Sequence, residues 1–291
     1  MRKNKTTVLF GMVFGVLCLY ILFLVVQLIW GLATSFRENL AFLENPFGVS
    51  GKWKLDNYVL AFDNIKKSVP DGQGAYKTVY IEDMVWNSLV YSVGCAFINT
   101  FVTCTVAYVV AKYDFKICRV IFNTVIVVMI LPIVGSLPAE IRMTKLLNIY
   151  GTMGGMFIMR ASFLGTYFFV FTAIYKGVPN DYMEAAYIDG ASDFNVYINI
   201  MFPMVKNTFS TILLLSFIAY WNDYSIPLIY LPDRPPLALG LYEFNMSTTN
   251  AVSTVPAKMA GCFCVFIPIF VIFILFQDKL TGNLYMGGLK E

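Results

Sequence analysis

The 291-residue sequence contains no histidine and few charged residues, and each shortage argues against a class of function. Without histidine, the chain lacks the side chain that most often acts as a general base near neutral pH and as a metal ligand. Charged residues make up 13% of the chain, well below the share of about 25% usual in soluble domains. The net charge of +3 is spread along the chain, without the blocks of Lys and Arg that are typical of nucleic-acid binding.

A phosphate-binding loop of the form G-x-x-x-x-G-K-[ST] is also absent. The glycine cluster GTMGG at 151–155 lacks the lysine, and we expect it to form a tight loop. We therefore do not expect this chain to cradle ATP phosphates, to hold a cofactor or a metal, or to act as an enzyme by itself.

Long apolar stretches dominate instead: 58% of the residues are hydrophobic and the mean hydropathy is +0.67. A bilayer core about 30 Å thick requires about 20 residues of apolar helix. Six stretches meet or nearly meet this length: 8–32, 87–111, 119–137, 156–175, 208–231 and 259–277. The first is too long for the apolar region of a signal peptide and no clear cleavage site follows it, so we expect it to be retained. The predicted fold is an all-α integral membrane protein with six transmembrane helices.

Basic residues predict the orientation of these helices, because short cytoplasmic segments carry an excess of Lys and Arg. The N-terminal tail holds Arg2, Lys3 and Lys5, and the short loop after the second stretch holds Lys112 and Lys116. Both termini are then cytoplasmic, although the loop 138–155 also carries basic residues. The predicted organisation is a tail with the first helix (1–32), an extracytoplasmic loop (33–86) and a five-helix core (87–291) containing a cytoplasmic loop at 176–207.

One polar segment, EAAYIDGASDFNVYINIMFP at 184–203, lies inside that cytoplasmic loop. Asn180 and Asp181 are typical of a helix start, and Gly190 is typical of a residue that ends a helix in the left-handed conformation. Ser192 can cap a second helix, and Pro203 closes the unit before the next apolar stretch. The segment predicts a helix, a sharp turn and a helix. Such a unit could dock into a groove of a partner or lie on the lipid surface, and its residues alone do not decide between these.

The spacing of this segment resembles the EAA loop in the permease subunits of binding-protein-dependent ABC importers. The family pattern is EAA, three residues, Gly, nine residues and I-x-L-P. Here the pattern is Glu184-Ala185-Ala186, Gly190 and Ile200-x-Phe202-Pro203, with phenylalanine in place of the usual leucine. Asp189 and Ala191 also fit the common DGA around the glycine.

Further motifs resemble the carbohydrate, maltose-type branch of these permeases, from about residue 50 to the C-terminus. They are Asp56-Asn57-Tyr58, Asn87-Ser88-Leu89, Ala107-Tyr108, Trp221-Asn222-Asp223-Tyr224, Pro227-Leu228-Ile229, and a tail containing Gln277, Gly282, Gly287-Gly288 and Lys290.

The resemblance implies a multi-pass protein of a bacterial or archaeal plasma membrane that works in a complex. Its implied partners are a second permease, two ATP-binding subunits that carry ATP and Mg, an extracellular solute-binding protein, membrane lipid and a sugar substrate. It also implies that the 176–207 loop inserts into the ATPase, with Glu184 as a polar anchor and small residues allowing close approach. The implied coupling residues are Glu184, Ala185, Ala186, Asp189, Gly190 and Pro203.

Polar or aromatic residues inside the apolar stretches are candidates for the transport pathway, because polar groups there usually face a cavity or another helix. The candidates are Asn99, Thr103, Trp221, Asn222 and Asp223. Asp223 could bind sugar hydroxyls or a gate, or could form a polar tie between helices with Asn222. Arg160 is expected to extend to the outer interface, and Gly94 and Gly165 to allow close helix packing.

Three alternatives remain open at the level of sequence. The first is an ABC importer permease for a non-sugar solute. The second is an ion-coupled secondary transporter, which would predict interrupted helices, repeated halves and charge pairs inside the membrane. The third is a membrane scaffold that transports nothing.

Overall fold

The computed structural model describes residues 2–48, 53–70, 74–131, 135–249 and 252–281, and these residues are mostly helical. The chain divides into two units: residues 1–67 with 240–268, and residues 68–239 with 269–291. The C-terminal motif from Gly282 onward lies outside the described residues.

The first unit contains three helices from the N-terminal part of the chain: α1 (Arg2–Ser35), α2 (Asn39–Glu44) and α3 (Asp56–Asn64). The buried Arg37 donates from Nη2 to the carbonyls of Ala41 and Asn45 at 2.6 and 2.8 Å, which fixes the end of α2. Asn57 donates to the carbonyls of Ser35 and Arg37 at 2.9 and 2.8 Å. Hydrogen bonds therefore fix the segment 33–48, and Asn57 of α3 holds it at the end of α1.

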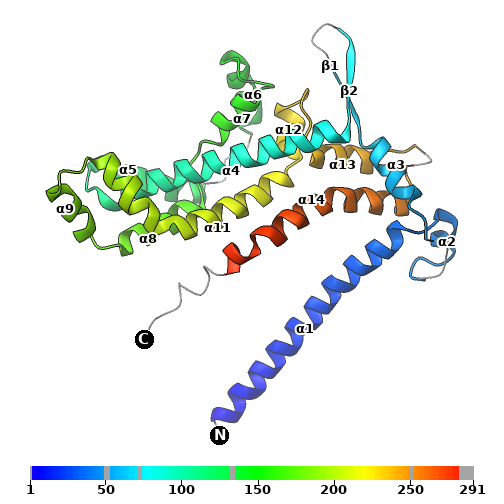
Figure 1. Cartoon of the computed structure of the whole chain (residues 1–291), viewed down its shortest axis with the longest axis horizontal. Helices are drawn as coiled ribbons and strands as arrows, with labels where there is room; N and C mark the ends of the chain where they lie inside the picture. Colours follow the sequence, from blue (N-terminus) through cyan, green and yellow to red (C-terminus); the bar gives the residue numbers. More distant parts are fainter. Residues whose placement is uncertain (1, 49–52, 71–73, 132–134, 250–251, 282–291) are drawn as a thin grey trace. The chain divides into compact units, whose positions relative to one another are not determined.

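The second unit contains most of the remaining elements, which Figure 1 shows in sequence colours. They are β2 (Tyr76–Val79), α4 (Ile81–Lys112), α5 (Lys116–Ile130), α6 (Leu137–Leu146), α7 (Met153–Arg160), α8 (Thr166–Gly177), α9 (Asp181–Ile188), α10 (Asp193–Val196), the π-helical turn η1 (Tyr197–Met201), α11 (Phe202–Trp221) and α12 (Ser225–Tyr230). Three elements cross the division: β1 (Lys67–Pro70), which pairs with β2, α13 (Leu237–Met246) and α14 (Val255–Thr281). The β1–β2 hairpin was not expected in an all-α protein.

In the second unit, α4 packs along α11 and α8, and α9 lies at one end of this bundle (Figure 1). Its core is aromatic and apolar, with Cys104, Phe168, Tyr175 and Met201 fully buried. A Cβ added to Gly94 would overlap the ring of Phe157, so Gly94 allows α7 to approach α4 as predicted. Gly165 has no such neighbour within 4 Å.

Four helices in the described part of the chain are long and apolar enough to cross a membrane: Phe10–Ser35, Ile81–Lys112, Asp193–Trp221 and Val255–Leu275. They coincide with the first, second, fifth and sixth expected spans, with shifted ends. The expected stretch 119–137 is represented by α5, which ends at Ile130.

The expectation of one uninterrupted helix over 156–175, and of another over 208–231, was wrong. The first stretch is interrupted at 161–165, between α7 and α8, and the second at 222–224, between α11 and α12. The second interruption has a local cause, because Asp223 uses its side chain to bind backbone: Oδ1 accepts the N–H of Ile226 at 3.2 Å and so caps α12. The predicted tight loop at GTMGG is confirmed only for its first two residues: Gly151 adopts φ +75°, and Thr152 caps α7, which begins at Met153, by accepting the Gly155 N–H at 2.9 Å.

Candidate functional site

The EAA-like segment folds in part as its sequence predicts: two helices flank a turn, but the second helix does not end at Pro203 and continues to Trp221. Helix α9 ends just before Gly190, which adopts φ +82°, and the Ser192 hydroxyl accepts the N–H of Asn195 at 3.4 Å to cap α10. The helix then widens into η1, where the N–H of Phe202 bonds to the carbonyl of Tyr197 five residues earlier. This widening precedes Pro203, which has no N–H to continue the ladder.

The proposed coupling residues divide into two groups by burial. Ala186 is buried, with 7% of its surface exposed, and it packs into the core of the second unit, as its neighbour Met183 does. Ala186 is therefore not available for close approach by a partner, whereas Glu184, Ala185 and Asp189 face outward.

Three apolar side chains beside these residues are exposed: Ile188 (86%), Phe194 (72%) and Tyr182 (51%). We call Tyr182, Ala185, Ile188 and Phe194 the α9–α10 face. Exposed apolar side chains grouped in a polar loop indicate a surface that binds another molecule. Ile188 and Phe194 were not among the candidate residues, although an apolar residue on each side of a glycine turn was a usable signal.

The C-terminal end of α4 is bonded to the start of this loop. Nζ of Lys112 donates to the Val178 carbonyl and, at 2.8 Å, to Oδ1 of Asn180. Because a lysine at the end of a helix also interacts favourably with the helix dipole, Lys112 joins α4 to the residues that begin α9.

The next residue, Tyr113, bonds to the far side of the loop. Its hydroxyl donates to Oδ1 of Asp193 at 3.0 Å, and the hydroxyl of Tyr187 donates to the same oxygen at 2.7 Å. Burial raises the pKa of Tyr113, and its hydrogen bonds with Tyr108, Tyr187 and Asp193 raise this pKa further. The hydroxyl therefore stays protonated and able to donate at neutral pH. We call Lys112, Tyr113, Tyr187 and Asp193 the loop clamp, because they fix α9 and α10 to α4.

Two pathway candidates, Asn99 and Thr103, donate hydrogen bonds to backbone carbonyls at the interruption between α7 and α8. Nδ2 of Asn99 donates to the carbonyls of Arg160 and Ser162 at 3.3 and 2.9 Å, and Oγ1 of Thr103 donates to the Asn99 and Ser162 carbonyls at 2.7 and 3.2 Å. Backbone carbonyls that lose their helical partners need such bonds when they are shielded from water. Both residues also line a hollow of about 480 Å³ beside Phe163.

Asp223 lies in the interruption between α11 and α12, not within a helix. Its Oδ2 accepts the Tyr91 hydroxyl at 2.9 Å and forms an ion pair with Nη2 of Arg160 at 3.3 Å. The expected tie with Asn222 is replaced by this cluster, since Nδ2 of Asn222 donates to the Ile218 carbonyl at 2.9 Å. Arg160 is therefore paired with Asp223, and its expected extension to the outer interface stays a prediction.

Trp221 is 2% exposed and packs against Phe217, with ring centroids 5.8 Å apart. It therefore offers no ring face to a sugar in this conformation. Its indole N–H has no hydrogen-bond partner among the described residues.

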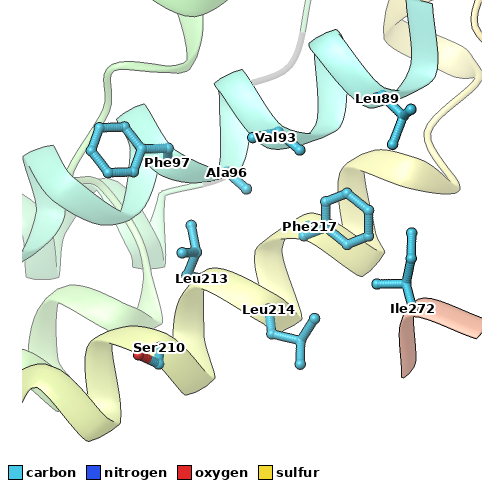
Figure 2. Close-up of a pocket in the computed structure, with 9 residues that line it drawn as sticks. All are labelled: Leu89, Val93, Ala96, Phe97, Ser210, Leu213, Leu214, Phe217 and Ile272. Carbon is cyan, nitrogen blue, oxygen red and sulfur yellow. The ribbon is translucent and has the colours of Figure 1, made fainter. Parts of the chain in front are cut away.

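An apolar groove runs between α4 and α11, with Ile272 of α14 at its side (Figure 2). Its volume is about 400 Å³ and its lining is hydrocarbon apart from Ser210. The lining residues are Leu89, Val93, Ala96, Phe97, Ser210, Leu213, Leu214, Phe217 and Ile272. Because it offers almost no hydrogen-bonding groups, this groove does not suit a sugar.

Comparison with known proteins agrees with these features. The sequence pattern of the family described as "Binding-protein-dependent transport system inner membrane component" matches residues 103–283, which is more than half of the chain. The chain is 22% identical over 280 residues to the diacetylchitobiose uptake system permease protein NgcG of Streptomyces coelicolor, covering 95% of this chain and 87% of that protein. It is 28% identical over 265 residues to the multiple sugar-binding transport system permease protein MsmG of Streptococcus mutans, covering 88% of each. It is 26% identical over 239 residues to the arabinooligosaccharides transport system permease protein AraQ of Bacillus subtilis, covering 81% of each.

The fold is also similar to that of a chain in the crystal structure of a bacterial ABC transporter involved in the import of the acidic polysaccharide alginate. The TM-score is 0.74 at 19% identity, and the similarity covers 94% of this chain and 97% of that chain. The matched family pattern spans α8, the EAA-like segment and α11, which are the elements that build the α9–α10 face and its support. The chain therefore belongs to the family of binding-protein-dependent transport system inner membrane components.

Proposed function

We propose that this chain is the transmembrane subunit of an ATP-driven importer that moves a sugar or oligosaccharide into the cell by alternating access. The names of NgcG, MsmG and AraQ support a carbohydrate cargo, because each belongs to a transport system for a saccharide. ATP and Mg would be bound by two partner ATPase subunits, and cargo would arrive from an extracellular solute-binding protein. A second permease would complete the complex in the plasma membrane of a bacterium or archaeon.

The proposed topology has six crossings with both termini in the cytoplasm. The four long helices supply four of them. Helix α5 supplies the third, and the interrupted pair α7–α8 supplies the fourth. In this arrangement the loop 176–207 is cytoplasmic, and residues 33–80 with the β1–β2 hairpin are outside.

The observation that carries this proposal is the α9–α10 face, where exposed apolar side chains sit on a unit fixed to α4 by the loop clamp. A partner that contacts Ile188 and Phe194 can bury apolar surface, and Glu184 at the edge of the same face can anchor a basic group. Movement of the partner would then displace α9 and, through Lys112 and Tyr113, the end of α4. Gly190 sets the angle between the two short helices. Asp189 precedes this turn, and Pro203 lies in the first turn of α11.

The test is purification of the full chain from its native membrane, followed by identification of the proteins that accompany it. The native chain should bring down an ATPase, and Ile188→Asp with Phe194→Asp should remove it. Both side chains are largely exposed, so these changes should leave the folded chain intact. Val59→Asp, at an exposed valine on α3 (60% exposed), is the matched control and should retain the ATPase.

Retention of the ATPase by the double variant would show that this face is not the docking surface. If no ATPase accompanies the native chain, the importer proposal itself fails.

A second candidate, an ion-coupled secondary transporter, is favoured by one observation. Interrupted helices and an Arg–Asp pair between membrane segments are features of such transporters. Uptake into vesicles separates the candidates: ATP inside the vesicle should drive uptake by an ABC importer, and an imposed ion gradient without ATP should not.

A further inference from the structure

Each of the two helix interruptions in the second unit is held by polar side chains. At 161–165, Asn99 donates to the carbonyls of Arg160 and Ser162. At 222–224, Oδ1 of Asp223 accepts from the Ser225 hydroxyl at 3.1 Å and from the Ile226 N–H at 3.2 Å. Interruptions of this kind divide a membrane helix into segments that can change their angle.

The Arg160–Asp223 ion pair joins these two interruptions. Arg160 is the last residue of α7, and its partner Asp223 is separated from it by 63 residues of sequence. The Arg160 guanidinium also lies over the ring of Tyr220, 5.4 Å from its centroid, and Tyr91 of α4 bonds to the same carboxylate oxygen. The pair therefore connects α4, α7 and α11 at one point.

The geometry of this pair is incomplete. A strong Arg–carboxylate pair usually makes two N–H···O bonds of about 2.7–2.9 Å, whereas here one nitrogen lies 3.3 Å from one oxygen. Nε of Arg160 is buried without a hydrogen-bond partner among the described residues. The two side chains are 26% and 15% exposed, so water satisfies them only in part. The pair therefore leaves hydrogen-bonding groups of Arg160 able to form a second arrangement. A fully hydrogen-bonded structural ion pair would leave none.

We propose that Arg160 and Asp223 form a latch between the two interruptions, which is closed in this conformation and opens during each transport cycle. The latch rests on the proposed function, since it assigns these positioning residues to the ATP-driven cycle. When it is closed, α7 and the α11–α12 junction are held together. When it opens, the segments on either side of the two interruptions can move apart, which is a two-state change of the kind that alternating access requires.

A reversible cross-link tests the latch directly. In a chain whose six native cysteines are replaced, Arg160→Cys with Asp223→Cys would be assembled with its ATPase and bridged by a short bis-methanethiosulfonate reagent. ATP hydrolysis by the purified complex should fall at least tenfold on bridging and return on reduction with dithiothreitol. Hydrolysis that continues unchanged in the bridged complex would overturn the proposal. So would a reduced double variant without hydrolysis, because removal of a latch should not stop the cycle.

Charge variants give an independent test in the cysteine-containing chain. Asp223→Asn or Arg160→Gln should raise ATP hydrolysis in the absence of cargo several-fold, and the swap Arg160→Asp with Asp223→Arg should lower it again. Glu243→Gln is the matched control, because it removes another ion pair, with Lys67 at 2.6 Å, and should leave hydrolysis unchanged. If the single variants hydrolyse ATP like the native chain, or the swap restores nothing, the latch is refuted. A native chain without any ATPase would instead refute the proposed function, and it would do so before any variant is made.

Discussion

A graded series of substitutions at Gly190 tests whether the turn between α9 and α10 sets the docking geometry. Gly190 has φ +82°, a conformation that costs other L-residues about 1–2 kcal/mol. A Cβ added there would meet nothing within 4 Å, so Gly190→Ala introduces backbone strain without a clash. A bias of this size changes the ratio of two states by a factor of roughly 5–30.

The other two substitutions bracket this effect. Gly190→Asn should be milder than Ala, because asparagine visits the left-handed region more readily. Gly190→Pro should be the most severe, because its ring fixes φ near about −65° and removes the N–H that bonds to the Tyr187 carbonyl at 3.0 Å. The expected order of retained function is Gly, Asn, Ala and Pro.

Two measurements follow the series: the amount of ATPase that accompanies the chain, and ATP-driven uptake in reconstituted vesicles. Gly177→Ala is the control, because Gly177 is exposed, lacks a positive φ and has open space around its Cα. Expression should not change across the series. The reasoning is wrong if the proline variant retains native uptake, or if the control loses as much as Gly190→Ala.

Three further predictions concern the support of the site. Gly155→Ala should lower the unfolding temperature in detergent, because the new Cβ would collide with the Ile149 carbonyl. An overpacking cost of about 1–3 kcal/mol corresponds to a decrease of roughly 2–10 °C. Gly154→Ala is the control and should not lower the unfolding temperature, because the space around Gly154 is open. Asn99→Leu should destabilise the chain by about 1 kcal/mol per lost hydrogen bond to the α7–α8 interruption, and an unchanged unfolding temperature would contradict this. Tyr113→Phe should reduce uptake per ATP hydrolysed without loss of the ATPase, whereas Tyr76→Phe on the exposed hairpin should not; equal coupling in both variants would show that the loop clamp transmits nothing.

The local structure of the EAA-like segment could be predicted because its signals are local. Helix α9 ends at Ile188, just before the left-handed Gly190, and α10 is capped by Ser192, so neighbours in sequence determine both conformations. The cytoplasmic side of this segment, in contrast, stays a prediction, since it depends on the bilayer and on partners.

The contacts that give the site its support could not be predicted, because they join residues far apart in the sequence. Arg160 and Asp223 are 63 residues apart, and Lys112 and Asn180 are 68 residues apart. Hydropathy averages over about 20 residues, so it smoothed over the short interruptions at 161–165 and 222–224 and predicted continuous helices. The burial of Ala186 also depends on tertiary packing, which the EAA pattern does not encode.

The helical rod from Asp193 to Trp221 is 29 residues long, which corresponds to about 43 Å at 1.5 Å per residue. A hydrocarbon layer is only about 30 Å thick, so a rod of this length must either lean over or project beyond the layer. The surplus amounts to about two and a half turns. Its N-terminal end carries Asp193 and Asn195, both of which suit water rather than lipid. If the surplus projects at this end, a partner that pushes on Asp193 moves a helix that ends just before Asp223 and contains the wide turn at 197–201.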